Sequence, residues 1–230
     1  MINLHHQVFG RKAIVKNEGL ILDLPFQNSF VDFTGKNTMI AGGNSNLPTF
    51  TLEGGEYAAT FNGSQSLKTN ANFNIGTDKV SISFWMKTSQ KAGAAIVEIS
   101  TNFNVNNAFA VFINDVLANK VEIADHNPSG YNLGSPPTNI NDNKWRHIVL
   151  TIDRTLVGNQ QNKIYVDGVL SYVQNTTHQT DLNGQWTLNP LFIGQRGGSS
   201  LGFNGQLKFL KIFNYPLSTT EITNLYNKTM

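Results

Sequence analysis

The chain has 230 residues, of which 40% are hydrophobic and 14% charged, with a formal net charge of +2 and no cysteine. The lack of cysteine excludes disulfides, thiolate catalysis and cysteine-based zinc sites. The Lys and Arg residues form no run that would bind nucleic-acid phosphates, and no apolar stretch approaches the roughly 20 residues of a membrane helix.

The first 18 residues differ from the rest of the chain. They contain neither an apolar segment of signal-peptide length nor a small-residue cleavage site. We expect residues 1–18 to form an N-terminal arm or an extra edge strand. No linker or composition break follows, so residues 19–230 are predicted to be a single domain.

Short apolar, β-branched and aromatic runs then recur between Gly, Asn, Pro and Asp, and helical periodicity is nearly absent. This series of strands with turn-rich joints predicts an all-β jelly-roll sandwich of two antiparallel sheets. The predicted strands are Leu20–Phe26, Tyr57–Phe61, Val80–Lys87, Ala95–Ser100, Phe109–Ile113, Lys120–Ile123, Trp145–Asp153, Lys163–Val166, Val169–Val173, Leu191–Ile193 and Gly205–Phe213.

Two of these strands indicate which face they bury. In VSISFWMK, residues 80–87, apolar side chains at even positions alternate with small or polar ones, and Trp85 stands on the polar face. In WRHIVLTID, residues 145–153, both faces are largely apolar, which is typical of a central strand covered on both sides.

The pair Asp167–Gly168 lies between two short strands. Asp–Gly in that position favours a type I′ hairpin turn, because both central residues need a positive φ. We therefore interpret Asp167 as a turn former with its carboxylate in solvent.

One helix is predicted, at the end of the chain. Ser218 is followed three residues later by Glu221, which is the pattern of a capping box. Ile222, Leu225 and Tyr226 follow at helical spacing and can pack on the edge of the sandwich.

Six segments, taken in order, resemble the laminin G-like branch of the concanavalin A-like lectin/glucanase superfamily. They include VSISFWMKTS, KWRHIVLTID and KIYVDGVL. The resemblance implies a curved pair of antiparallel sheets in a module that is mostly non-catalytic and binds glycans or proteins, often with a structural calcium. The six segments are Leu20–Asn37, Ala59–Leu67, Val80–Ser89, Lys144–Asp153, Lys163–Leu170 and Leu191–Tyr226.

The sequence departs from the family pattern at two places. Lys208 and Phe209 follow FNGQL, where the family often has an acidic pair, and Arg146 replaces the first His of the family's WHh motif. A lysine at the first of these positions makes calcium binding there less favourable.

The sequence offers no catalytic constellation. A sandwich glycosidase needs two carboxylates about 5–9 Å apart across a cleft, but Glu98 and Glu122 stand alone on their strands and are expected to face solvent. No two His have metal-binding spacing, and no Gly-x-Ser-x-Gly nucleophile elbow is present. We therefore predict that the protein is not an enzyme, with a sandwich-fold glycoside hydrolase or lyase as an alternative.

The loop DFTGKN is the candidate calcium site, through Asp32, Thr34 and Asn37. It supplies about three of the six to eight oxygen ligands that Ca²⁺ takes. The alternative is a turn in which Asp32 accepts hydrogen bonds from nearby backbone amides.

Glycan binding needs an aromatic platform beside polar groups, and three predicted loops offer one. The first, Ala124–Asn139, carries His126, Asn127, Tyr131 and Asn132. The second, Gln174–Trp186, carries Trp186, and the third, Gly194–Gly205, carries Arg196. Tyr131 packed under its own loop and Trp186 plugging one end of the sandwich are the alternatives.

These observations favour a non-catalytic surface recognition or assembly module. The lack of a leader suits a phage or virion structural protein (a decoration, fibre or tail component) located at a virion or extracellular surface. Its expected partners are surface glycans or proteins, with capsid or tail proteins or further copies of itself as candidates. The alternative is a secreted carbohydrate-binding module or adhesin.

Overall fold

The computed structural model describes residues 18–43, 46–75, 78–100, 108–127, 130–156, 160–174, 186 and 188–228, with the backbone alone at 127 and 130–134. The predicted arm, residues 1–18, lies outside the described residues except for Glu18, which begins a turn. Within the described ranges, no helix is long and apolar enough to cross a membrane.

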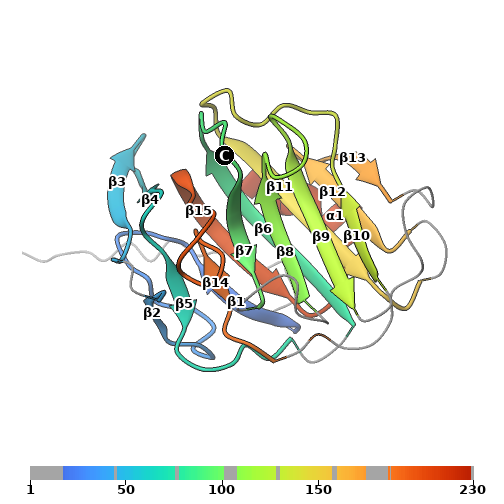
Figure 1. Ribbon diagram of the computed structural model, residues 1–230, viewed down its shortest axis with the longest axis horizontal. Coiled ribbons are helices and arrows are strands. Elements are labelled where there is room, and N and C mark those ends of the chain that lie inside the picture. Colours follow the sequence, from blue (N-terminus) through green and yellow to red (C-terminus); the bar gives the residue numbers. More distant parts are fainter. Residues whose placement is uncertain are drawn as a thin grey trace, which may run out of the picture.

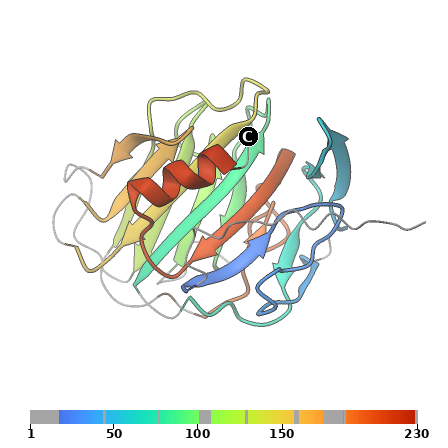
Figure 2. The same ribbon diagram turned by 180° about the vertical axis from the view of Figure 1, so that it is seen from behind.

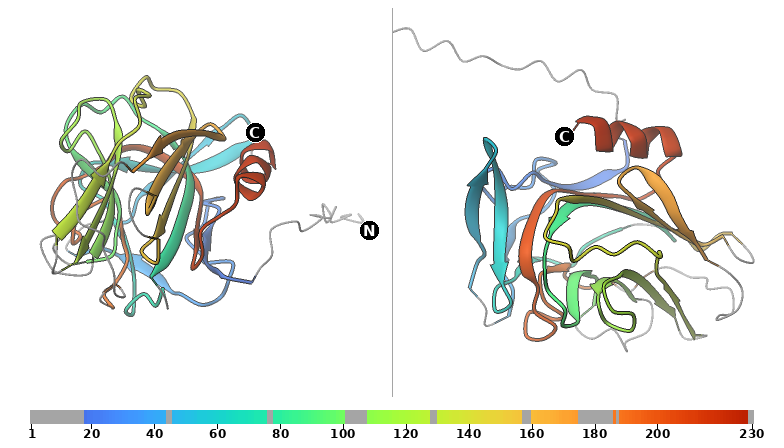
Figure 3. Two further views of the ribbon diagram at one scale, coloured as in Figure 1. Left: turned by 90° about the vertical axis from the view of Figure 1, so that its right-hand side faces the viewer. Right: turned by 90° about the horizontal axis from the view of Figure 1, so that it is seen from above.

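Two antiparallel sheets lie face to face, as predicted (Figures 1 and 3). The eight-stranded sheet has the order β13-β12-β11-β6-β15-β4-β3, and β1 pairs with β15 beside this path. Its strands are β1 (Leu20–Leu24), β3 (Thr49–Glu53), β4 (Glu56–Asn62), β6 (Lys79–Lys87), β11 (Arg146–Asp153), β12 (Asn162–Val166), β13 (Val169–Val173) and β15 (Asn204–Phe213).

The seven-stranded sheet faces the viewer in Figure 1 and has the order β10-β9-β8-β7-β14-β5-β2. Its central strands are short and almost entirely buried. The strands are β2 (Met39–Ala41), β5 (Leu67–Thr69), β7 (Ala94–Glu98), β8 (Ala108–Ile113), β9 (Val121–Asn127), β10 (Gly130–Gly134) and β14 (Phe192–Ile193).

The core lies between the two sheets and follows the predicted alternation of β6. Val80, Ile82, Phe84 and Met86 point into it and are at most 1% exposed. From the facing sheet, side chains such as Phe109 of β8 belong to the same cluster. Burial of these side chains stabilises the sandwich by about 1.5–3 kcal/mol for each large residue.

The predicted helix is α1 (Thr219–Lys228), which lies on the outer face of the eight-stranded sheet (Figure 2). The capping box is confirmed, because the backbone N–H of Ser218 donates to Glu221 at 2.8 Å and that of Glu221 donates to the Ser218 hydroxyl at 3.3 Å. Ile222 and Leu225 pack with Val149 of β11, so that strand is covered on both faces, as expected.

The Asp167–Gly168 turn has the expected positive φ values of 51° and 78°. The expectation that its carboxylate points to solvent is wrong, however. One oxygen of Asp167 accepts a hydrogen bond from the Arg146 guanidinium and the other from the backbone N–H of His147, both at 2.9 Å. The carboxylate therefore fastens the hairpin to the beginning of β11.

One predicted loop contains regular structure that sequence analysis missed. Much of Ala124–Asn139 is a hairpin in which β9 pairs with β10, and Tyr131 stands opposite His126. The Gly, Asn, Pro and Ser residues in this stretch mask the strand pattern. Strands β2, β3 and β5 were also missed, because two have three residues and the third is mostly exposed.

Candidate ligand site on the outer face of the seven-stranded sheet

Three of the predicted ligand residues belong to one sheet or its adjoining loop. His126 lies on β9, Tyr131 pairs with it from β10, and Arg196 follows β14 in the segment that crosses to the other sheet. Residues distant in sequence are therefore brought to one side of the molecule. We call this side the front face, and define it by His126, Ala110, Ala124, Phe112 and Arg196 with their neighbours on β7–β9.

The floor of the front face is made of small side chains. Ala110 of β8 stands opposite Glu98 of β7 on one side and opposite Ala124 of β9 on the other. Ala95, Ala110, Phe112 and Ala124 form an apolar cluster separate from the main core. These side chains are at most 2% exposed, and Leu201, five residues after Arg196, packs against them.

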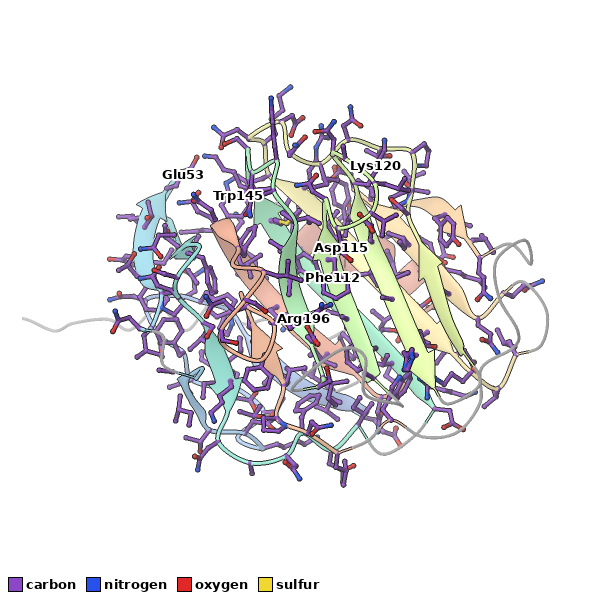
Figure 4. The ribbon with its side chains drawn as sticks, in the orientation of Figure 1. Glu53, Phe112, Asp115, Lys120, Trp145 and Arg196 are labelled. Atoms are coloured by element: carbon purple, nitrogen blue, oxygen red, sulfur yellow. The ribbon has the colours of Figure 1, made fainter. Side chains whose placement is uncertain are left out.

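Arg196 is held over this floor by two contacts. Its guanidinium carbon lies 4.7 Å from the centre of the Phe112 ring, and its Nε donates to Glu98 at 3.1 Å. Figure 4 shows Arg196 and Phe112 together in front of the sheet. The Glu98 side chain is fully buried, whereas the Arg196 side chain is 23% exposed. A stacked guanidinium fixed by a buried carboxylate is a preorganised hydrogen-bond donor.

Glu98 and Glu122 were expected to face solvent, but both are fully buried on the front face. Burial raises the pKa of each carboxyl, and the charge of Asp115 adds to the increase. Glu98 accepts from the Ser100 hydroxyl and from Arg196. Glu122 accepts backbone N–H bonds from Asp115, Val116 and Leu117, and so holds the turn between β8 and β9.

Glu98 lies on β7 and Glu122 on β9, so one strand, β8, separates them. Along the strand direction they are offset by two residues, because Glu98 is level with Ala110 and Glu122 with Phe112. Ordinary strand spacing and rise place their Cα atoms about 12 Å apart. Both carboxylates are occupied by protein donors, Glu98 by Ser100 and Arg196 and Glu122 by backbone N–H groups. These hydrogen bonds fit structural roles for the two groups.

Trp186 was predicted to be an exposed platform, and this is wrong because it lies in the interior. It is 5% exposed, its indole N–H donates to Asp125 at 3.1 Å, and its ring stands edge-on to Phe109. The guanidinium carbon of Arg154 lies 4.4 Å from its ring centre. Trp186 thus plugs the sandwich, which was the alternative interpretation.

The same buried group supports the hairpin that carries His126. The Nε of Arg154 donates to Asp125 at 3.0 Å, and its Nη2 donates to the carbonyl of His126 at 2.8 Å. Removing one member of a buried ion pair leaves an unpaired charge, which costs about 3–5 kcal/mol. Arg154 and Asp125 therefore fix the backbone at His126 from below.

The remaining predicted residues are placed by register alone. Asn127 pairs with Gly130, and Asn132 pairs with Asp125. Of the predicted loop Gln174–Trp186, residues 175–185 lie outside the described residues. The predictions of ligand contact for Asn127, Tyr131 and Asn132 therefore stay predictions.

Asp32, Thr34 and Asn37 come together as expected, but in an arrangement that does not suit calcium. The Asp32 carboxylate accepts from the backbone N–H groups of Asp23, Thr34 and Asn37 and from the side chains of Thr34 and Asn37. Burial alone would raise the pKa of Asp32, but these hydrogen bonds lower it below its ordinary value.

Calcium takes six to eight oxygen ligands. Here the N–H and O–H groups around Asp32 donate hydrogen bonds to its carboxylate instead of offering oxygen atoms to an ion. We therefore correct the calcium expectation for this loop: Asp32 acts as a cap for its own turn. Across the described ranges, no group of three or more His, Cys, Asp or Glu gathers as a metal site would.

The fold defines a class of protein, the antiparallel jelly-roll sandwich with two large sheets. The family follows from the sequence, because a profile described as the concanavalin A-like lectin/glucanases superfamily matches residues 61–223. The chain belongs to this family, in its laminin G-like branch. A comparison with curated protein sequences found no match.

Solved structures share the fold at low sequence identity. Domain 4 of AbnA, an extracellular GH43 arabinanase from Geobacillus stearothermophilus, solved with arabinotriose, is 18% identical with a TM-score of 0.72, and the match covers 90% of this chain and 98% of that domain. The botulinum neurotoxin serotype D binding domain is 21% identical with a TM-score of 0.67, and the match covers 93% of this chain and 51% of that one. The chain thus spans about half of the toxin binding domain.

Proposed function

We propose that this protein is a non-catalytic carbohydrate-binding module whose front face binds a glycan. The observation that carries the proposal is the Arg196 guanidinium, stacked on Phe112 and fixed by the buried Glu98. The Arg196 side chain is 23% exposed. A sugar presents a rim of hydroxyls, for which a planar donor group held in one orientation is a suitable partner.

The rim of the front face suits the same ligand. Its apolar floor is at most 2% exposed, so we place the sugar against Arg196 at the rim rather than on the alanines. His126, half-buried at the other end of β9, can donate or accept a hydrogen bond. The fold relative solved with arabinotriose is a sugar-binding protein of this architecture, and we extend that property to this chain as part of the proposal.

A hydrolase is less well supported than a binding module. Glu98 and Glu122 each accept hydrogen bonds from several protein donors. Both oxygens of Glu122 accept from backbone N–H groups of the turn between β8 and β9. A general acid or nucleophile must reach the scissile bond. We therefore infer that these two carboxylates shape the front face. Location at a virion or other extracellular surface stays a prediction from the sequence.

The proposal is tested by calorimetric titration with neutral hexasaccharides derived from arabinan, xylan, cellulose and starch. We expect at least one hexasaccharide to bind. Arg196→Ala should raise its dissociation constant about tenfold or more, which corresponds to the loss of one or two hydrogen bonds to a charged donor. The matched control is Lys228→Ala, an exposed cation on α1, which should bind as the wild type does.

Arg196→Ala leaves Glu98 buried without its charged partner and can therefore destabilise the protein. The second variant combines Arg196→Ala with Glu98→Gln. Its midpoint temperature of thermal unfolding should return towards that of the wild type while its affinity for the sugar stays low. If no hexasaccharide binds the wild type at millimolar concentration, or if both Arg196 variants bind normally, the front-face proposal is wrong.

A further inference from the structure

The outer face of the eight-stranded sheet is only partly covered by α1. The helix packs over Leu20, Val149, Tyr165 and Phe213. Figures 2 and 3 show the rest of this face between α1 and the β3–β4 hairpin. Lys208 and Phe209, one of the two places at which the sequence departs from the family pattern, lie on this face.

A β-bulge in β15 sets the backbone conformation at Lys208 and Phe209. The register with β6 shifts between Lys208 and Lys211, and Phe209 has a φ of 54°. A bulky residue with positive φ is an outlier that persists only where its surroundings enforce it, and such strain clusters at functional sites. Bulges also re-aim side chains, and here the Phe209 ring lies 5.4 Å from the Lys208 ammonium.

Aromatic rings surround the same ammonium. Lys208 Nζ lies 4.7 Å from the ring centre of Trp145 and 5.8 Å from that of Trp85. Trp85 is 5% exposed and stacks on Tyr226 of α1, so the helix closes one side. Trp145 is half-buried and presents the accessible part of the aromatic surface.

Charged groups complete the surroundings in two matched pairs. Lys208 pairs with Glu56 at 2.8 Å, and Lys87 pairs with Glu53 at 2.6 Å. The Glu53 carboxylate also accepts a hydrogen bond from the Trp145 side chain, and Figure 4 shows these two residues near one another at the rim. The side chains of Glu53 and Glu56 are 44% and 43% exposed.

Hydroxyl and amide groups extend the surface across the neighbouring strands. Thr51 and Thr60 share a hydrogen bond of 2.7 Å on the exposed side of β3 and β4, and Gln206 reaches Thr60 at 3.4 Å. The surface therefore offers one half-buried indole (Trp145), the edge of the buried Phe209 ring, two cations, two carboxylates and a row of neutral polar groups.

We propose that this surface, defined by Trp145, Lys208, Phe209, Glu53, Glu56 and Lys87, is a second sugar site that takes a neutral oligosaccharide. Each cation of this surface is paired with a carboxylate, so donors and acceptors are balanced and no net charge favours an ionic ligand. A sugar hydroxyl both donates and accepts, and its ring stacks on an indole. This inference rests on the proposed sugar-binding function and adds a site on the opposite side of the sandwich.

The test uses the indole N–H signals in nuclear magnetic resonance spectra of the full chain, which has three Trp. The probes are the four neutral hexasaccharides. We expect one of them to shift the Trp145 signal, assigned through Trp145→Phe, and to leave the buried Trp186 signal in place. Glu53→Ala should raise the dissociation constant obtained from the Trp145 shift about fivefold or more, as loss of one hydrogen bond predicts. The matched exposed control Glu18→Ala should leave this dissociation constant unchanged.

The outcomes separate the two sites. If Arg196→Ala abolishes all binding and the Trp145 signal never moves, the second site is overturned and the front face stands. If the Trp145 shift survives Arg196→Ala, the second site is supported independently. If sugars that carry a carboxylate or an amine bind here more tightly than neutral ones, the neutral-ligand assignment is wrong. If no hexasaccharide moves any signal, both proposals fail.

Discussion

Single residues in this protein have roles that their sequence context does not reveal. His147 is 1% exposed, its Nε2 lies 3.0 Å from the Ser83 hydroxyl, and its ring contacts those of Trp85 and Tyr226, which also stack on each other. Its Nδ1 is buried without a hydrogen-bond partner in the described part of the chain. Burial lowers the pKa of His147 to about 4.

This residue predicts how stability changes with pH. Between the ordinary pKa of 6.5 and the folded pKa of about 4, the unfolded chain binds the proton and the folded chain does not. The free energy of unfolding therefore falls as the pH falls through this window, by about 3 kcal/mol in total. Urea denaturation at pH 7 and pH 5 should show a smaller loss for His147→Gln than for the wild type. Equal losses in the two proteins would show that His147 does not set this slope.

Connections between elements are fixed by single carboxylates. Asp32 holds the loop between β1 and β2 through five donors, as Asp167 holds the turn between β12 and β13. In both places a short polar side chain replaces the hydrogen bonds that a regular strand would make, so the loop has one conformation.

Stability measurements can distinguish the two interpretations of Asp32, a cap for the β1–β2 loop or a calcium ligand. We expect Asp32→Ala to lower the free energy of unfolding by about 2–3 kcal/mol, because it leaves five partly buried donors of the loop without their charged acceptor. Addition of EDTA to the wild type should change nothing. The measurement is urea denaturation, with the exposed Asp142→Ala as control. A loss of stability on EDTA addition would restore the calcium interpretation.

The elements that sequence analysis predicted are those with strong alternation. The strand Val80–Lys87 and the cap at Ser218 depend on local pattern, and both are confirmed. The hairpin partner β10 was missed, since its Gly and Asn residues resemble loop composition. Site residues were harder to predict, because Arg196 and Glu98 meet across 98 positions of sequence. The burial of Glu98 is also a result of tertiary packing, which no local pattern encodes.

At the scale of the whole molecule, the two sheets present two different outer faces. The front face is built on alanines with a stacked arginine, whereas the face beside α1 is built on Trp145 and paired charges. Sites on opposite sides of a rigid sandwich would let one module bind two sugar chains, or one module in a repeated array bind with avidity.

Sugar binding at the front face can be mapped from backbone amide shifts in nuclear magnetic resonance spectra as the tightest-binding hexasaccharide is added. We expect the largest shifts to include β7, β8, β9 and the segment Gly194–Phe203, and we expect Arg196→Ala to remove them. Unchanged amide signals over all of these strands at saturating sugar would contradict this expectation.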